Sequence, residues 1–322
     1  MTRRLIIILA MAVLCVSCAT DDSDQLTTAS RMLPRGKYSG NETGPTPVGA
    51  IPDITVRDAA RNRDITLTVE YPTRGNPSPL IVFSHEYGGS NRAYVGLSSY
   101  WASNGYVVIR PSHVDRGGFD AQTDADAQAR VKDILAVIDG LDSLEQRYPE
   151  LQGKIDRTKI AVAGHGLGGQ TALLAANDPR IKAVVAMAPV TRGAAAVNKP
   201  ALFITDQKDD AFKLAGAADQ WHVTIENAVP MAYTGRFEAF TEAQAREAAR
   251  ASDPIMDPTM GDRQREMRGQ RLQTAMLRTQ EMFGIVRGGA VAFLDAYLKG
   301  NAEGRKALED LKDRRGVTVE QK

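Results

Sequence analysis

Short apolar runs alternate with amphipathic stretches through the middle of the chain. The runs have the length of strands and are bounded by Gly, Pro or polar residues: 65–71, 80–83, 106–109, 160–163, 183–186 and 201–205. The first alternates apolar and polar positions, whereas the others are continuous, which is typical of parallel strands buried on both faces. Residues 124–145 carry apolar side chains at three- and four-residue spacings, the pattern of a helix with one buried face.

This alternation predicts an α/β fold with a mostly parallel central sheet and helices on both faces. After about residue 240 the pattern becomes helical, over 242–251, 263–283 and 289–299, so we expect a helical C-terminal segment. In sheets of this type ligands bind at the carboxyl ends of the strands. Candidate chemistry is therefore sought in the segments that follow the apolar runs.

The first residues indicate export. A short basic segment, Arg3-Arg4, precedes an apolar stretch over 5–16 that is too short for a transmembrane helix, which needs ~20 residues. Ser17-Cys18-Ala19 then resembles the cleavage box of bacterial lipoproteins, in which Cys18 would be acylated. The alternative is an ordinary signal peptide with an incidental cysteine. We expect a protein that is lipid-anchored to a membrane of the cell envelope.

These patterns divide the chain into four parts. We expect a signal peptide over 1–17, a flexible tether rich in Asp, Ser, Thr, Gly and Pro over 18–50, a hydrolase-like domain over 51–300 and a helical tail over 301–322. Both cysteines lie in or next to the leader, so the folded part has no disulfide and no thiolate metal site. The nearly neutral charge of the mature chain gives no reason to expect nucleic acid as a partner.

The glycine-rich turn at 164–169 has two interpretations. Gly164, Gly166 and Gly169 satisfy G-x-G-x-x-G, the dinucleotide-binding fingerprint. That fingerprint normally follows the first strand of its domain, whereas several strands precede this one. The next strand also lacks the terminal acid that binds ribose. A strand, a tight turn and a helix equally describe the nucleophile elbow, G-x-S-x-G, which exposes a serine at the edge of the sheet.

The second interpretation explains more of the sequence. Residues 164–169, GHGLGG, resemble the G-H-S-L-G-G elbow of the α/β-hydrolases. Residues 79–90 resemble the oxyanion strand and loop of that superfamily, and 101–113 and 292–299 resemble its next strand and its closing helix. More narrowly, the chain resembles the bacterial dienelactone hydrolases and the platelet-activating-factor acetylhydrolases, with relatives among the cutinase-like polyester hydrolases. The resemblance implies an α/β-hydrolase fold without a cofactor.

The resemblance also implies that the catalytic machinery is incomplete. The nucleophile position is Gly166, and the position of the family's histidine is Pro230. The acid survives as Asp209, with Asp210 as the next candidate. The oxyanion donors would be the backbone N–H groups of Leu167 and of Glu86 or Tyr87, and Glu86 replaces the usual glycine.

We therefore expect a catalytically inactive pseudo-hydrolase that binds a small acyl or ester ligand or a protein partner in the envelope. The alternative is a carboxylic-ester hydrolase with residual or unconventional catalysis, and the third hypothesis is the dinucleotide-binding protein. His85, His113 and Asp115 follow strand ends and are expected to flank the pocket. A metal site of His85, Glu86 and His113 is conceivable, but structural histidines at a sheet edge are favoured because no ligand spacing is recognisable.

Overall fold

The computed structural model describes residues 35–75, 77–115, 123–191, 197–206, 212, 216, 219–226, 228, 233 and 262–322, with side chains of the last helix from residue 277 onward. Residues 35–322 form one compact unit. The predicted leader with Cys18, the proposed acids Asp209 and Asp210, the position Pro230 and the predicted helix over 242–251 lie outside the described residues.

One nine-stranded sheet runs through the unit, in the order β1-β2-β4-β3-β5-β6-β7-β8-β9. Its strands are β1 (Val48–Asp58), β2 (Arg63–Pro72), β3 (Ser78–Ser84), β4 (Val107–Pro111), β5 (Ile155–His165), β6 (Ile181–Met187), β7 (Ala201–Thr205), β8 (Gln220–Ile225) and β9 (Val317–Gln321). The strands from β4 to β8 in this order are parallel, and β1, β2 and β9 are antiparallel additions at the two edges. The predicted α/β architecture is confirmed.

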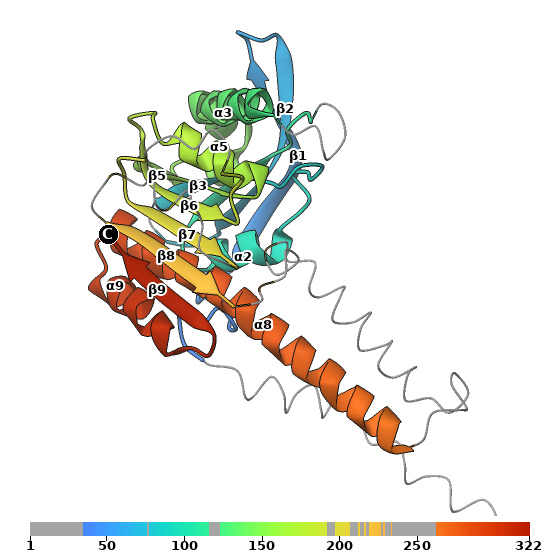
Figure 1. Ribbon diagram of the computed structural model, residues 1–322. Helices are drawn as coiled ribbons and strands as arrows, with labels where there is room; N and C mark the ends of the chain where they lie inside the picture. The colour runs from blue at the N-terminus through green and yellow to red at the C-terminus, as the bar shows by residue number, and fades with distance from the viewer. Residues whose placement is uncertain are drawn as a thin grey trace, which may run out of the picture. The chain divides into compact units, whose positions relative to one another are not determined.

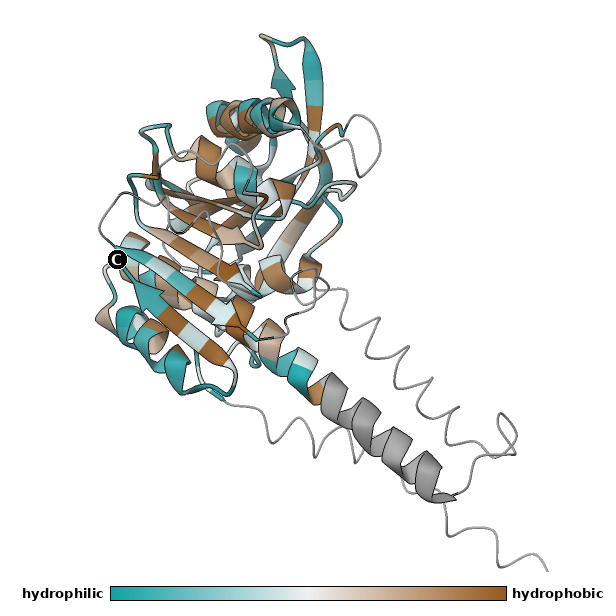
Figure 2. Ribbon diagram, viewed as in Figure 1, coloured by the Kyte–Doolittle hydropathy of each residue, from teal (hydrophilic) through white to brown (hydrophobic). Residues whose placement is uncertain are grey.

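Helices cover both faces of this sheet (Figure 1). They are α2 (Val95–Ser103), α3 (Asp124–Asp139), α4 (Leu141–Arg147), α5 (Leu167–Ala175), α8 (Asp262–Leu298) and α9 (Ala302–Glu309), with short 3₁₀ turns η2 (Pro149–Leu151) and η4 (Asp310–Asp313). Helices α2, α8 and α9 contribute to the core on one face, and α3, α4 and α5 to the core on the other. Both cores draw on the apolar central strands, which are brown in Figure 2. None of the helices over the described residues is both long and apolar enough to cross a membrane.

Two predicted helix boundaries differ from the structure, and a glycine lies at each of them. The helix expected over 124–145 is divided at Gly140 into α3 and α4. The two helices expected over 263–283 and 289–299 are instead one continuous helix, α8. Gly288 does not interrupt it, because its small size serves a close approach: a Cβ there would lie 2.0 Å from the carbonyl oxygen of Tyr38.

The described ends of the unit also differ from expectation. The tether was expected to extend to residue 50, but Lys37 Nζ lies 2.6 Å from the buried carboxylate of Asp295 on α8, and β1 already begins at Val48. The C-terminal tail was expected to be helical, but after α9 and η4 it ends in β9, which pairs with β8. Val317 is buried in this strand, so the tail completes one edge of the sheet and adds to the core.

Candidate active site

The nucleophile elbow has the backbone geometry that the sequence predicts. Strand β5 ends at His165, Gly166 adopts φ 56° and ψ −118°, and α5 begins at Leu167. A positive φ is strained for residues other than glycine, and this strain is what makes an elbow project its residue from the sheet edge. Gly168 is required for packing, since a Cβ there would lie 2.1 Å from the carbonyl oxygen of Ser84. The glycine pattern thus has a local explanation that needs no nucleotide.

Glu86 occupies the place that a nucleophile would take. A Cβ built on Gly166 would lie 1.4 Å from Oε2 of Glu86 and 2.5 Å from its Oε1, so a side chain at residue 166 would have to displace this carboxylate from its position. The backbone N–H of Tyr87 donates to Oε1 at 2.6 Å, and the N–H of Leu167 donates to the same oxygen at 3.2 Å. Two of the three predicted oxyanion donors therefore converge on one oxygen, and that oxygen belongs to the protein.

The third candidate donor points elsewhere, because the N–H of Glu86 donates to the hydroxyl oxygen of Tyr94 at 3.3 Å. Burial raises the pKa of the Glu86 carboxyl, and the two backbone N–H groups partly offset this by stabilising the anion. The Glu86 side chain keeps 26% of its surface exposed. It is thus a half-desolvated carboxylate that remains in contact with solvent.

His165 supports the elbow and cannot act as its base. Its Nδ1 is hydrogen-bonded to the hydroxyl of Tyr94 at 2.8 Å and lies 3.9 Å from Oε2 of Glu86, beyond hydrogen-bonding distance. The ring of Tyr233 stacks on it with centroids 4.9 Å apart. Burial lowers the pKa of His165 to about 4, so the imidazole is neutral at pH 7. The imidazole therefore points into the structure that supports the elbow.

A Ser–His–Asp relay lies next to the elbow, in the interior. Nε2 of His113 is 2.9 Å from Oγ of Ser84, and Nδ1 of His113 is 2.9 Å from Oδ2 of Asp133 on α3. All three side chains are buried. Arg61 and Arg63 both form ion pairs with Oδ1 of Asp133, at 2.6 and 3.1 Å.

The pKa values of this relay fit a neutral imidazole beside an ionised carboxylate. Burial lowers the pKa of His113, despite the opposing effect of Asp133. The pKa of Asp133 is lowered as well: burial acts to raise it, but hydrogen bonds from His113 and Arg61 outweigh burial. The sequence pattern placed His113 beside the pocket but gave no role to Asp133. The available signal was an acid directly beside the apolar stripe of helix 124–145.

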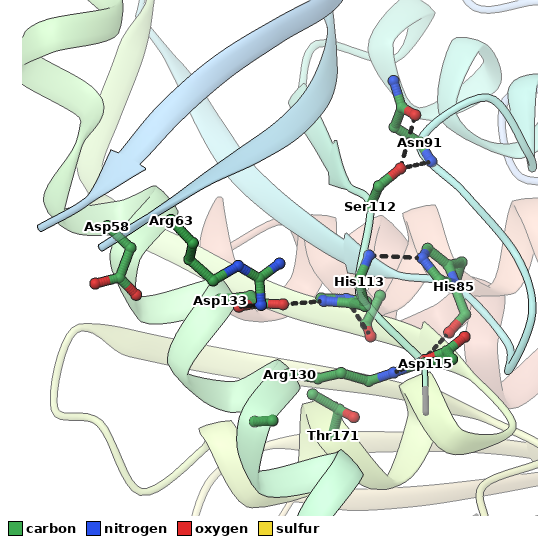
Figure 3. A network of polar contacts seen from close by, with 12 residues as sticks. Asp58, Arg63, His85, Asn91, Ser112, His113, Asp115, Arg130, Asp133 and Thr171 are labelled. Carbon is green, nitrogen blue, oxygen red and sulfur yellow. Dashed lines mark hydrogen bonds and ion pairs between the residues drawn. The ribbon is translucent and has the colours of Figure 1, made fainter. Parts of the chain in front are cut away.

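His85 and Asp115 belong to the same buried network (Figure 3). Nε2 of His85 accepts the backbone N–H of His113 at 3.1 Å, and Nδ1 of His85 is 2.7 Å from the carbonyl oxygen of Glu86. Arg130, buried on α3, donates to the carbonyl oxygen of His85 at 2.6 Å and pairs with Asp115 at 2.5 Å. Asp115 in turn accepts the N–H of Gly88 at 2.6 Å. These contacts fix the loop over 85–88, and with it Glu86.

The three residues expected to flank the pocket therefore serve mainly as supports of this loop. The conceivable metal site of His85, Glu86 and His113 has its imidazole nitrogens committed to protein groups, and burial lowers the pKa of His85 well below its usual value. Over the described part of the chain, no group of three or more His, Cys, Asp or Glu side chains is arranged to hold a metal ion.

Comparison with known proteins places these observations beside characterised relatives. The family model described as Chlorophyllase matches residues 42–215. Cutinase est1 of Thermobifida alba is 26% identical over 170 residues, which are 52% of this chain and 54% of that protein. Cutinase est2 of the same organism is 30% identical over 124 residues, 38% of each chain. A platelet-activating factor acetylhydrolase of Cavia porcellus is 24% identical over 155 residues, 36% of each chain.

The chain spans about half the length of the cutinases that head this comparison. Among solved structures, a ferulic acid esterase from Streptomyces cinnamoneus superposes with a TM-score of 0.55 and 20% sequence identity, over 80% of this chain and 91% of that one. At this level of identity the likeness concerns the fold alone. All these relatives carry names of ester-cleaving enzymes, whereas the elbow described above has a carboxylate where a serine would stand.

Proposed function

Because the chain belongs to the chlorophyllase family, and so to the α/β-hydrolases, we propose that it is a pseudo-hydrolase whose site binds a small acyl or ester ligand without cleaving it. One observation carries the proposal: Oε1 of Glu86 accepts both backbone N–H groups that would stabilise an acyl oxyanion, and its Oε2 overlaps the nucleophile position. Acyl transfer needs a nucleophile at that position and free donors for the oxyanion. Here the Glu86 carboxylate occupies the nucleophile position and also engages the two oxyanion donors.

The test is hydrolysis of p-nitrophenyl acetate and butyrate by purified residues 19–322, beside Asp209→Ala. We expect both proteins to hydrolyse these esters at the rate of an equal concentration of a protein without an active site. Binding is measured separately, as the shift in melting temperature with ethyl butyrate, and we expect stabilisation of both. Hydrolysis that is fast in the natural sequence and falls with Asp209→Ala would overturn the proposal.

The cellular location is part of the proposal. The leader with a lipobox-like Ser17-Cys18-Ala19 supports export and a lipid anchor on Cys18, with the membrane of the envelope as the first partner. Replacing Cys18 with Ala should release the protein into the soluble envelope fraction. Membrane partitioning that is unchanged in Cys18→Ala would contradict the anchor. A protein partner in the envelope would be sought by cross-linking of the anchored form.

One observation favours a second candidate, a carboxylic-ester hydrolase with unconventional catalysis. Ser84, His113 and Asp133 have the order and spacing of a nucleophile, a base and an orienting acid. Against this, Ser84 has no exposed surface, so an ester cannot reach it without local opening. A fluorophosphonate probe distinguishes the candidates: labelling of Ser84 that Asp133→Asn abolishes would support the second, and absence of labelling supports the first.

A further inference from the structure

We propose that Glu86 is itself a nucleophile, and that this site reacts with small carbon electrophiles such as epoxides, forming an ester on the Glu86 carboxylate. The inference concerns a different reaction from ester hydrolysis and does not depend on whether the site binds an acyl ligand. The two oxygens of the Glu86 carboxylate have different surroundings.

The first oxygen, Oε1, is held by the protein. It accepts the N–H groups of Tyr87 and Leu167, the second of which is the first residue of α5 and belongs to the positive end of that helix. Two donors on one oxygen fix the plane of the carboxylate. They also favour the ionised form of the group, and Oε1 can keep both hydrogen bonds as the carbonyl oxygen of the ester once Oε2 has formed its bond.

The second oxygen, Oε2, has no hydrogen-bond donor among the described residues. The nearest charged or titratable partner is Nδ1 of His165 at 3.9 Å, and that nitrogen is engaged with Tyr94. Oε2 lies 1.4 Å from where the Cβ of residue 166 would be. The α/β-hydrolase elbow thus presents a reactive oxygen in nearly the usual place, although the oxygen comes from the neighbouring loop.

Accessibility and desolvation favour reaction at this oxygen. The Glu86 side chain retains 26% exposure, in contrast to Ser84 of the buried relay, which has none. A carboxylate that has lost part of its water and lacks a donor on one oxygen needs little further desolvation to attack. Carboxylate side chains form covalent intermediates in several enzyme classes when they are positioned in this way.

In the proposed reaction, Oε2 gives an electron pair to the less substituted ring carbon of an epoxide, a C–O bond forms, and the ring C–O bond breaks. The ring oxygen keeps that electron pair and takes a proton from water. The product is a hydroxyalkyl ester of Glu86, heavier by the mass of one epoxide molecule. Because His165 is neutral and already bonded to Tyr94, no described residue next to Oε2 is placed to activate water against this ester, so we expect a stable adduct.

The test uses 1,2-epoxybutane with the purified full chain, and mass spectrometry of the intact protein and of its peptides. We expect one adduct per chain that hydroxylamine releases as an ester, located on Glu86; thioethers formed on Cys15 or Cys18 resist hydroxylamine and are distinguished in this way. Glu86→Gln keeps the shape and both backbone hydrogen bonds but removes the anion, and labelling should fall at least tenfold. Glu86→Asp keeps the anion but withdraws it from the elbow, so labelling should fall comparably.

Glu145→Gln is the matched control, because the Glu145 side chain is similarly covered (18% exposed) but is paired with Arg157 at 2.8 Å. It should label like the natural sequence. The melting temperature of each variant is recorded, so that loss of labelling is read only from folded protein. Labelling of Glu86 no faster than that of other carboxylates, or labelling that survives in Glu86→Gln, would overturn the proposal. Ester hydrolysis in the parallel assay would contradict the pseudo-hydrolase function and leave this test unaffected.

Discussion

The elbow and the buried relay are neighbouring regions at the carboxyl ends of the central strands, and each lacks a different part of a catalytic site. The elbow has the strained turn, the helix terminus and two converging N–H groups, but a glycine at the nucleophile position. The relay has serine, histidine and aspartate at hydrogen-bonding distances, but all three are buried. Catalysis requires a nucleophile that is both activated and reachable, so residue identity alone identifies neither region as active.

The difference also concerns what each region does for the fold. Glu86 is partly exposed and held by two backbone N–H groups, so the elbow can change without exposing the core. Asp133 joins α3 to the loop after β4 through His113, and to the β1–β2 hairpin through Arg61 and Arg63. We therefore expect substitutions at the elbow to change chemistry, and substitutions in the relay to change stability.

Rebuilding the elbow gives the largest expected effect. Gly166→Ser with Pro230→His should remain inactive, because the Glu86 carboxylate occupies the space of the new side chain. Adding Glu86→Gly should free both the space and the two N–H donors, and raise hydrolysis of p-nitrophenyl butyrate by about 10²–10³-fold over the natural sequence, since triad members act as a unit. Initial rates of the double and triple variants measure this.

Glu86→Gly alone is the control for that experiment, and should hydrolyse the ester no faster than the natural sequence. If the double variant were as active as the triple one, Glu86 would not be the obstacle that the geometry indicates. If the triple variant were folded but inactive, then the positions assigned to histidine and acid, Pro230 and Asp209, would be wrong, because both were taken from resemblance alone.

Removing the acid of the relay should cost stability and leave the chemistry of Glu86 unchanged. Asp133→Ala leaves His113, Arg61 and Arg63 without their shared buried partner, and the loss of one member of a buried ion pair costs roughly 3–5 kcal/mol in the free energy of unfolding. Urea unfolding of the variant and of the natural sequence measures this change in the free energy of unfolding. Asp142→Ala is the matched control: this exposed aspartate pairs with Arg157, and its removal should cost no more than about 1 kcal/mol. Equal costs would remove the distinction between the two regions.

The sequence predicted those features of the fold and of the candidate site that depend on local pattern. Continuous apolar runs identified the parallel strands, and the resemblance to α/β-hydrolases, which family membership confirms, identified the turn between a strand and a helix at Gly166. With the family established, the dinucleotide interpretation has no remaining support. Strand β9 was missed because its alternation is short, and Gly288 was not recognised as a close contact because its partner, Tyr38, is distant in sequence.

The position of the Glu86 carboxylate could not be predicted for a different reason. A single substitution in the oxyanion loop, Glu86 in place of the usual glycine, indicated a charge near the site. Where the carboxylate lies depends on the loop over 85–88, which Arg130 and Asp115 hold from α3 and from the segment after β4. Such long-range supports leave no local pattern in the chain.

The smallest expected effect is a pH dependence that separates the elbow histidine from the relay. In the folded protein the pKa of His165 is about 4, and in the unfolded chain it returns to about 6.5, so between these values the unfolded chain binds a proton that the folded protein does not. Stability is therefore lost as the pH falls from about 6.5 towards 4, by about 3 kcal/mol at most, and no further below. His165→Gln, whose amide oxygen can still accept from Tyr94, should show a correspondingly shallower loss when urea unfolding is compared at pH 7 and pH 4.5. His85 and His113 are unchanged in that variant, so their own acid sensitivity cancels in the comparison. An identical pH dependence of the two proteins would mean that other titratable groups govern acid stability, and that the elbow histidine is not the buried neutral support that its contacts with Tyr94 and Tyr233 indicate.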